Sequence, residues 1–342
     1  MAVRVGLDLG SSAITICSEK GILGSEPAVV ALERKTGRML AVGEEAERLV
    51  GTHTVDAALY YPFAESIVSR DFTAHLVLYF LRKYVQAPLS SISLLLSIYC
   101  DFSELDATAL AELCMQTGIA ELHTVAAPVA VLASRGEQAG RPTMLVHIGG
   151  SRTDIMVAAH GRVIYQDSAR IAGRAFDEAI VSYLQERYNV SVGLKTAENI
   201  KLQIGTVTDK EHRVVRIRAR RPDGSLTELQ LASREMLDAL LQPTAQLVEA
   251  ICRAVFRIPS ADVEDIFGQG ILLSGGGASL DGLAELASGL VGVPMAVLQK
   301  PEMCVAGGMV HLLPLLTEKF HRGAIALSDL LLQTLFAFHM QK

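Results

Sequence analysis

The chain has 342 residues, of which 50% are hydrophobic and 20% charged, so it can form two domains with full hydrophobic cores and is too apolar for long disordered stretches. Its formal net charge of −6 argues against general nucleic-acid binding, which needs a basic surface. Five scattered cysteines without a Cys-x-x-Cys pair indicate a reducing compartment. With no leader and no long apolar run, the sequence predicts a cytoplasmic protein that does not cross a membrane.

The first half of the chain is expected to alternate strands and helices. Ser103 is a good helix N-cap, and Gly118 follows the end of the same helix. Residues 92–99 are almost continuously apolar, which is typical of a central strand covered on both faces. The expected elements, in chain order, are three strands within 1–32, a turn at Thr36-Gly37, helices over 44–50 and 71–84, a strand over 92–99, a helix over 103–117, a strand over 123–125, a helix over 128–134 and a linker over 136–142.

The second half repeats this plan after the linker, which indicates an internal duplication. An alternating segment over 213–220 turns at Pro222-Asp223-Gly224 into residues 226–231 and predicts a β-hairpin. The other expected elements are strands over 143–148, 154–159, 162–168 and 270–273 and helices over 173–188, 196–204, 233–256 and 281–290. Such an alternation of strand clusters and helices predicts α/β layers.

Two strand–turn–strand segments carry glycine at the turn. They are Gly6-Leu7-Asp8-Leu9-Gly10-Ser11-Ser12 and Val146-His147-Ile148-Gly149-Gly150-Ser151-Arg152-Thr153-Asp154. Glycines let backbone N–H groups close on phosphate oxygens, and the serine hydroxyls add donors. A carboxylate at the end of the first strand, Asp8, can hold a hydrated metal ion. Two such hairpins can bind a nucleotide triphosphate between two half-domains.

A third glycine cluster, Ser274-Gly275-Gly276-Gly277-Ala278, follows a predicted strand and precedes a helix expected to begin near Asp281. Backbone without side chains at that place can lie flat against a base or ribose. Glycines after a strand are more often a simple turn, but three glycine loops in a duplicated α/β chain favour a nucleotide site.

These loops and several other segments carry a resemblance to a known family. The segments are Gly6–Gly10, Leu40–Ala46, Asp71-Phe72, Tyr79-Phe80, Arg170–Gly173, Phe176–Ile180, Tyr188-Asn189, Thr196–Gly205, Ser274–Ala278 and Pro301–Ala306. In this order they resemble the MreB-like bacterial actins over nearly the whole chain, to about residue 315. The resemblance implies an α/β actin-like fold with two RNase H-like domains around an interdomain nucleotide cleft, each with a small appended subdomain.

The resemblance also implies domain boundaries and a cellular role. Domain I would comprise residues 1–142 and about 308–342, with its small subdomain at about 33–66. Domain II would comprise residues 143–307, with its small subdomain at about 189–240. The implied function is a cytoskeletal filament of this chain, alone or with another bacterial actin, peripheral at the inner face of the cell membrane. There it would act with membrane proteins of wall synthesis to control cell shape.

Carried over residue by residue, the resemblance implies a site for ATP or ADP. The first phosphate loop would be Asp8, Gly10, Ser11, Ser12 and Ala13, and the second Gly149, Gly150 and Ser151. The ribose and base would meet Glu198, Asn199, Ile200 and Lys201, and the adenine would meet Gly275, Gly276, Gly277 and Ala278. Asp8 would hold Mg²⁺ indirectly, through its water shell.

Three departures from the family pattern fall on the hydrolytic machinery. Ala126-Ala127 stand where the family has two glutamates before a proline, one of which orients the attacking water. His147 replaces an aspartate, and Arg152 replaces a threonine. Alanine cannot polarise water, and a neutral imidazole is a poor magnesium ligand, whereas Arg152 can compensate phosphate charge. Because each lost group typically costs about 10² in rate, hydrolysis is expected to be very slow or absent.

Three alternatives stay open at this point. The chain could be an active ATPase with a relocated water-positioning group, for which Glu121 and Asp154 are the nearby carboxylates. It could be a non-polymerising pseudo-actin that caps or regulates other filaments. A sugar kinase or Hsp70-like chaperone shares the fold class, but no kinase-like catalytic aspartate stands in an obvious motif.

Three further segments require an interpretation. A basic cluster on the predicted hairpin is one solvated face, a polyanion site or a subunit contact, and the resemblance favours the subunit contact among the functional alternatives. Without interleaved aromatic residues the cluster does not indicate nucleic acid. Its members are Lys210, Arg213, Arg216, Arg218, Arg220 and Arg221. An apolar stripe over 327–338 is too short to span a bilayer and either docks on the protein's own core or meets a membrane surface or a partner. Pro88-Leu89 is a faint candidate for an apolar membrane loop.

Overall fold

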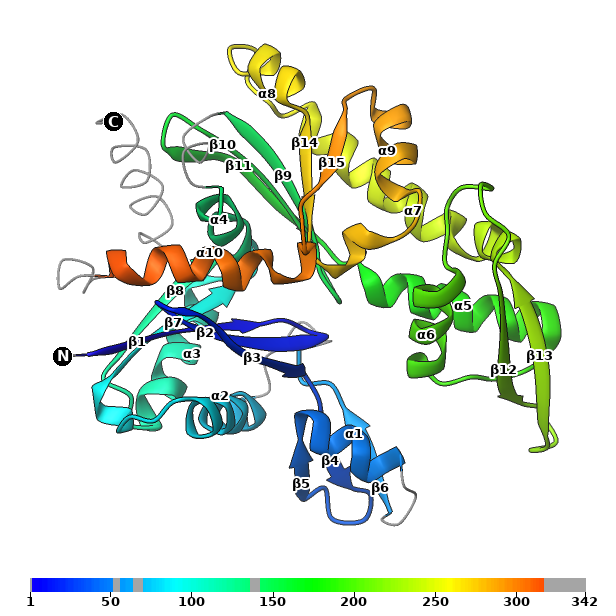
Figure 1. The fold of residues 1–342 in the computed structure, drawn as a ribbon, viewed down its shortest axis with the longest axis horizontal. Coiled ribbons are helices and arrows are strands. Elements are labelled where there is room, and N and C mark those ends of the chain that lie inside the picture. The colour runs from blue at the N-terminus through cyan, green and yellow to red at the C-terminus, as the bar shows by residue number, and fades with distance from the viewer. Residues whose placement is uncertain (1, 52–55, 64–69, 136–141, 317–342) are drawn as a thin grey trace. The chain divides into compact units, whose positions relative to one another are not determined.

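A computed structural model describes residues 2–51, 56–63, 70–135 and 142–316 (Figure 1). The chain forms two compact units. Unit 1 contains the residues up to Pro142, Ala158–Gln166 and the chain from Glu302; unit 2 contains Thr143–Val157 and Asp167–Pro301. The apolar stripe over 327–338 and all of the expected linker except Pro142 lie outside the described residues.

A five-stranded sheet with the order β3-β2-β1-β7-β8 is the centre of unit 1. Its strands are β1 (Val3–Leu9), β2 (Ala13–Ser18), β3 (Gly21–Pro27), β7 (Ile92–Ile98) and β8 (Glu121–Ala126). β1 pairs antiparallel with β2 through the first glycine turn and parallel with β7, which in turn pairs parallel with β8. The continuously apolar run is therefore a central strand, as its sequence predicted.

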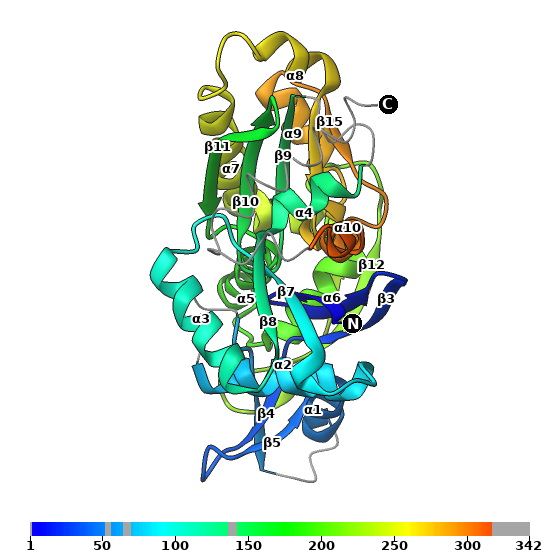
Figure 2. The same ribbon diagram turned by 90° about the vertical axis from the view of Figure 1, so that its left-hand side faces the viewer.

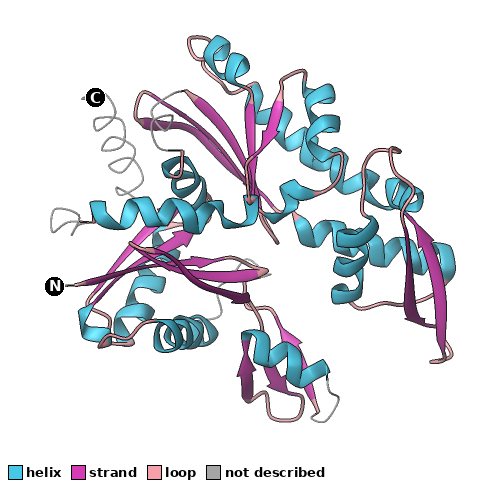
Figure 3. Ribbon diagram, viewed as in Figure 1, coloured by secondary structure: helices cyan, strands magenta, loops and turns pink. Residues whose placement is uncertain are grey.

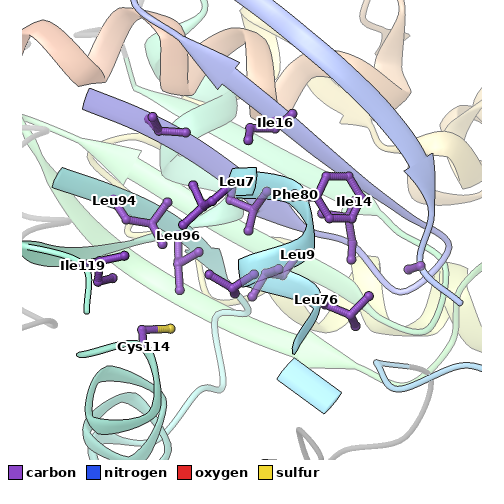
Figure 4. Packing of buried hydrophobic residues seen from close by; sticks show 14 of the residues in the cluster. Leu7, Leu9, Ile14, Ile16, Leu76, Phe80, Leu94, Leu96, Cys114 and Ile119 are labelled. Atoms are coloured by element: carbon purple, nitrogen blue, oxygen red, sulfur yellow. The ribbon is translucent and has the colours of Figure 1, made fainter. Parts of the chain in front are cut away.

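Helices cover both faces of this sheet, as Figures 1 and 2 show. They are α2 (Arg70–Tyr84), α3 (Glu104–Gln116), α4 (Ala127–Ala133) and α10 (Cys304–Leu312). Because side chains alternate along a strand, Leu7 and Leu9 of β1 pack with Phe80 of α2 and Cys114 of α3 on one face (Figure 4). Gly6 faces the other way, toward Met309 of α10.

A small three-stranded sheet with the order β5-β4-β6 also belongs to unit 1. Its strands are β4 (Val30–Glu33), β5 (Met39–Val42) and β6 (Ala57–Tyr60), and α1 (Gly43–Gly51) packs on them. The sequence predicted α1 and the turn before it but not these strands as a sheet. Each strand has only four residues, too few for a clear alternation.

A second five-stranded sheet has the order β11-β10-β9-β14-β15 and is the centre of unit 2, although the end of β10 and most of β11 fall in the segment Ala158–Gln166 that is grouped with unit 1. Figure 3 distinguishes its strands from the surrounding helices. The strands are β9 (Thr143–Ile148), β10 (Thr153–Ala159), β11 (Arg162–Ala169), β14 (Ile271–Ser274) and β15 (Met295–Val297). The helices of this part are α5 (Gly173–Tyr188), α7 (Ser233–Val255), α8 (Val263–Gln269) and α9 (Leu283–Val291). β15, α8 and α10 were not predicted.

The predicted hairpin is present as β12 (Val214–Arg220) and β13 (Leu226–Ala232), beside α6 (Leu194–Ile204). Much of its basic cluster is neutralised within the chain: Arg213 Nη2 lies 2.6 Å from Asp281 Oδ2, and Lys210 pairs with Glu285. Arg218 lies 3.6 Å from Glu228 across the two strands. These contacts agree with a solvated hairpin face. Within the described ranges, no helix is long and apolar enough to cross a membrane.

Candidate functional site

The first glycine turn joins β1 to β2 in unit 1. A Cβ on Gly10 would lie 2.4 Å from the carbonyl oxygen of Ala13, so only glycine fits this turn. Ser11 is buried, whereas Ser12 and Ala13 are exposed. The turn is therefore narrow, with Ser12 and Ala13 exposed on it, which is compatible with a phosphate loop.

Asp8, the last but one residue of β1, is held by a residue that the sequence did not indicate. Ser97, near the end of β7, donates a hydrogen bond from Oγ to Asp8 Oδ1 at 2.5 Å and accepts one from the Leu9 N–H at 3.0 Å. Burial raises the pKa of Asp8 to about 6, and the Ser97 hydrogen bond acts in the opposite direction. Mg²⁺ bound to phosphates needs one or two protein carboxylates, so Asp8 fits a hydrated magnesium ion.

The second glycine turn lies between β9 and β10 in unit 2. Its ends close through a hydrogen bond from the Gly149 N–H to the carbonyl oxygen of Arg152, at 2.9 Å. The start of α5 caps the turn: the Gly173 N–H donates to the Gly149 carbonyl at 3.1 Å, and the Arg174 N–H donates to the Gly150 carbonyl at 2.7 Å. Ser151 and Arg152 are half-buried at its tip.

His147 stands at the end of β9, directly opposite Ser274 of the parallel strand β14. Its Nδ1 lies 3.0 Å from Ser274 Oγ, within hydrogen-bond distance. Burial lowers the pKa of His147 to about 4, so the imidazole is neutral near pH 7. A neutral imidazole bonded to a serine offers no oxygen to Mg²⁺, and this turn does not fit the magnesium ion that an aspartate there would face. In the described part of the chain, no group of three or more His, Cys, Asp or Glu side chains could hold a metal ion.

The third glycine cluster packs against the second turn. Gly275 has φ +82°, and a Cβ there would lie 2.3 Å from the carbonyl oxygen of Ile148; a Cβ on Gly277 would lie 2.4 Å from Ile148 Cγ2. Residues Gly276–Ser279 form a short 3₁₀ helix, and Ala278 is buried. The helix expected to begin near Asp281 is α9, which begins two residues later, at Leu283. The cluster is therefore closely packed against the end of β9, next to the second glycine turn.

The helix α6 carries the four residues expected at the ribose and base. Asn199 is exposed and Glu198 half-buried, with Glu198 Oε2 3.0 Å from Lys195 Nζ. The Ile200 side chain is only 1% exposed, so it packs in the interior and leaves no side-chain surface for a ligand. Lys201 Nζ lies 2.8 Å from Asp177 Oδ1 and donates to the Gly173 carbonyl at 2.9 Å.

Comparison with known proteins decides the family. A family model described as MreB/Mbl protein matches residues 2–319. The cell shape-determining protein Mbl of Bacillus subtilis is 32% identical over 312 residues, which cover 89% of this chain and 93% of Mbl. The chain belongs to the MreB/Mbl family. This confirms the resemblance drawn from the ordered segments.

Solved structures show the same fold for this MreB/Mbl family member. The structure of MreB5 of Spiroplasma citri bound to ADP matches with a TM-score of 0.86 at 22% identity, covering 94% of this chain and 99% of MreB5. The MamK double helical filament matches with a TM-score of 0.78 at 20% identity, covering 92% of this chain and 99% of MamK. The predicted actin-like α/β fold is therefore confirmed.

The two positions at which the resemblance led us to expect glutamates lie in a buried apolar segment. Ala126 ends β8 and Ala127 begins α4; they are 7% and 6% exposed. Through β7, the Ala126 end of β8 lies at the same sheet edge as Asp8, because Ala126 pairs with Ile98 and Leu96 pairs with Leu7. Neither alanine has a group that can orient a water molecule.

The pairing register of β7 with β8 excludes Glu121 as a replacement for these glutamates. Glu121 pairs with Ser93 at the opposite end of β8, five residues from Ala126 and so about 16 Å away along the strand. Its carboxylate lies 3.6 Å from His123 Nε2 instead. Asp154, 1% exposed at the start of β10, is the other carboxylate that the sequence proposed, and its role stays a prediction.

The neutral His147 makes a testable contribution to pH dependence. Its pKa is about 4 in the folded state and 6.5 as the ordinary value, so the unfolded chain binds more protons between these limits and stability falls with falling pH. Titration of His147 should therefore lower the free energy of unfolding by about 2 kcal/mol between pH 7 and pH 4. This is less than a pKa shift of this size gives for a fully buried group, because the ring is half-buried.

His147→Asn keeps an acceptor toward Ser274 and removes the titration. Urea unfolding from pH 7.5 to pH 4.5 should show the free-energy advantage of wild type over this variant decreasing as the pH falls. Asp8 and Asp177, whose raised pKa values act with the opposite sign, are common to both proteins and cancel. Parallel pH profiles would contradict the prediction.

Proposed function

We propose that this chain binds an adenine nucleotide, assembles into filaments and acts in the control of cell shape and wall synthesis, with ATP hydrolysis very slow or lost. The proposed phosphate contacts are the turns at Gly10–Ala13 and Gly149–Ser151, with Mg²⁺ held indirectly by Asp8. The proposed ribose and adenine contacts are Glu198 and Asn199 of α6 and the loop Gly275–Ala278. Ile200 and Lys201 lie on the same helix but are not proposed as direct contacts, because Ile200 packs in the interior and Lys201 contacts α5.

The relatives support the nucleotide and filament parts of the proposal. MreB5 was solved bound to ADP and, in another structure, to AMPPNP, and MamK was solved as a double helical filament. Mbl is a cell shape-determining protein. By this kinship, we propose self-assembly or co-assembly with another bacterial actin, a cytoplasmic location at the inner membrane face and contacts with membrane proteins of wall synthesis.

The loss of hydrolysis rests on one observation, the pair Ala126-Ala127 at the sheet edge that also holds Asp8. The bound nucleotide would then stabilise the filament without being consumed. A missing water-orienting carboxylate lowers the rate by about 10² or more. His147 supports the same conclusion, because a neutral imidazole is a poor magnesium ligand. Arg152 can compensate phosphate charge but lacks the hydroxyl group of the threonine expected there.

Sedimentation of the purified protein with and without Mg-ATP, with phosphate release followed in the same tube, tests the proposal. We expect pelleting that depends on ATP, with phosphate release at least about 100-fold slower than for a family member that has the glutamates. Asp8→Ala is the control for nucleotide dependence and should abolish the effect of ATP on pelleting.

Two other results of the sedimentation experiment would contradict parts of the proposal. Phosphate release at the rate of the glutamate-bearing relative would overturn the loss of hydrolysis and favour the active ATPase, with Asp154 as the residue to mutate next. A lack of both pelleting and release, with retained binding to another bacterial actin, would favour a capping or regulatory pseudo-actin.

A further inference from the structure

The helices α5 and α6 of unit 2 are joined by a nearly buried ion pair. Lys201 Nζ lies 2.8 Å from Asp177 Oδ1, and their side chains are 13% and 11% exposed. The same ammonium group donates a hydrogen bond to the carbonyl oxygen of Gly173 at 2.9 Å. A charge-assisted hydrogen bond shielded from water is strong and directional, and together with the ion pair it fixes the first turn of α5 against α6.

The first turn of α5 in turn holds the second glycine turn. No side chain caps α5, and two of its first N–H groups donate to the carbonyls of Gly149 and Gly150 at 3.1 and 2.7 Å. A Cβ built on Gly173 would lie 3.4 and 3.6 Å from these two oxygens and 3.5 Å from Lys201 Nζ. The ammonium group and both turn carbonyls therefore converge on Gly173.

This arrangement sets the direction of the N–H groups of the turn. The chain has no cis peptide bond in its described part, and in a trans peptide the C=O and N–H groups point in opposite directions. With the carbonyls of Gly149 and Gly150 directed at α5, the N–H groups of Gly150 and Ser151 are directed away from it. Successive backbone N–H groups that face out of a turn can bind phosphate oxygens.

We infer that Lys201 is a positioning residue for phosphate binding: bound to Asp177 and the Gly173 carbonyl, it holds α5 so that Gly150 and Ser151 present their N–H groups to the nucleotide phosphates. The inference rests on the proposed nucleotide binding. It assigns Lys201 an indirect role in place of the direct ribose or base contact expected for its segment. Glu198 lies one helical turn earlier, so α6 connects the base side of the site to the phosphate side.

The indirect role of Lys201 and a direct contact with ribose or base predict different effects on the binding of nucleotide and nucleoside. If Lys201 acts through the phosphate turn, its removal weakens ligands that carry phosphates and spares the nucleoside. If Lys201 contacts the ribose or base, the affinities for nucleotide and nucleoside fall together. A purely structural pair changes the unfolding midpoint and leaves both affinities unchanged.

The test compares the full-length Lys201→Met variant with wild type by equilibrium dialysis against radiolabelled Mg-ATP and adenosine. We expect at least a tenfold loss of affinity for ATP and less than a twofold change for adenosine. Asp177→Asn should act in the same direction, and the double variant should bind ATP no more weakly than Lys201→Met alone, since both changes break one link. Lys201→Arg, which keeps charge and donors, should recover part of the affinity.

Lys195→Met is the matched control, because Lys195 lies on the same helix in a more exposed pair with Glu198 and should leave the ratio of the two affinities unchanged. Equal losses for ATP and adenosine, or no loss for either, would overturn the inference and leave the proposed function standing. A wild-type protein that binds neither ligand would overturn the proposed function and this inference with it. If Lys201→Met does not fold, Asp177→Asn carries the test.

Discussion

Gly308→Ala is expected to destabilise unit 1 by about 3 kcal/mol or more and to leave little folded protein at 37 °C. A Cβ on Gly308 would lie 1.6 Å from the carbonyl oxygen of Ala130 and 2.4 Å from its carbonyl carbon. Both atoms belong to the backbone of α4 and cannot rotate away, so α10 would have to leave its place on α4. Urea unfolding followed by circular dichroism, with the soluble fraction after expression, measures the effect.

The neighbouring Gly307 provides a matched control in the same helix. No atom lies within 4 Å of a Cβ built on Gly307. Alanine is the better helix former by about 1 kcal/mol, so Gly307→Ala should be neutral or stabilising by up to that amount. Equal stabilities for the two variants would show that the close approach of α10 to α4 does not hold the unit together. Because α4 begins at Ala127, this packing also fixes the segment on which the loss of hydrolysis is argued.

Local signals in the sequence were sufficient for much of the fold. The turn at Gly10 and the cap at Ser103 depend on residues within a few positions, and the structure has the turn and a hydrogen bond from the Asp106 N–H to Ser103 Oγ at 3.1 Å. The strands β4–β6 and β15 and the helices α8 and α10 were missed because each is short and has no clear periodicity in its own sequence. Their stability comes from pairing and packing with distant segments, which periodicity within a short window does not reveal.

In the candidate site, too, some residues could be located from local sequence and others depend on contacts between distant segments. Asp8, the glycine turns and the substituted alanines could be located from motif order and family resemblance. Ser97 could not, because it lies in an apolar run and reaches Asp8 only through the parallel pairing of β7 with β1. The contact of His147 with Ser274 depends on the register of β9 with β14, 127 residues apart in sequence. The direction of the Lys201 amine toward α5 likewise required the packing of two helices.

Glu26→Ala is expected to cost unit 1 about 3 kcal/mol or more, since it leaves partly buried donors without their acceptor. Glu26 is 2% exposed at the end of β3 and accepts hydrogen bonds from two elements. From α2 these come from Lys83 Nζ at 2.7 Å, Tyr84 OH at 2.7 Å and Tyr79 OH at 3.1 Å, and from α1 one comes from the Glu44 N–H at 3.3 Å. The carboxylate therefore ties the small sheet, through α1, to the main sheet and α2.

The pH dependence and a surface control separate this role from a general effect of losing a glutamate. Burial acts to raise the pKa of Glu26, but the hydrogen bonds from Lys83, Tyr84 and Glu44 outweigh it and the pKa is lowered. The stabilisation is therefore present above the ordinary value of 4.5 and lost below it, so the advantage of wild type over Glu26→Gln should shrink as the pH falls through that range. Glu19→Ala, which breaks an exposed 2.9 Å pair with Arg4, should cost about 0.5 kcal/mol or less. Similar losses for Glu19→Ala and Glu26→Ala in urea unfolding would mean that the small sheet is held by its apolar contacts alone.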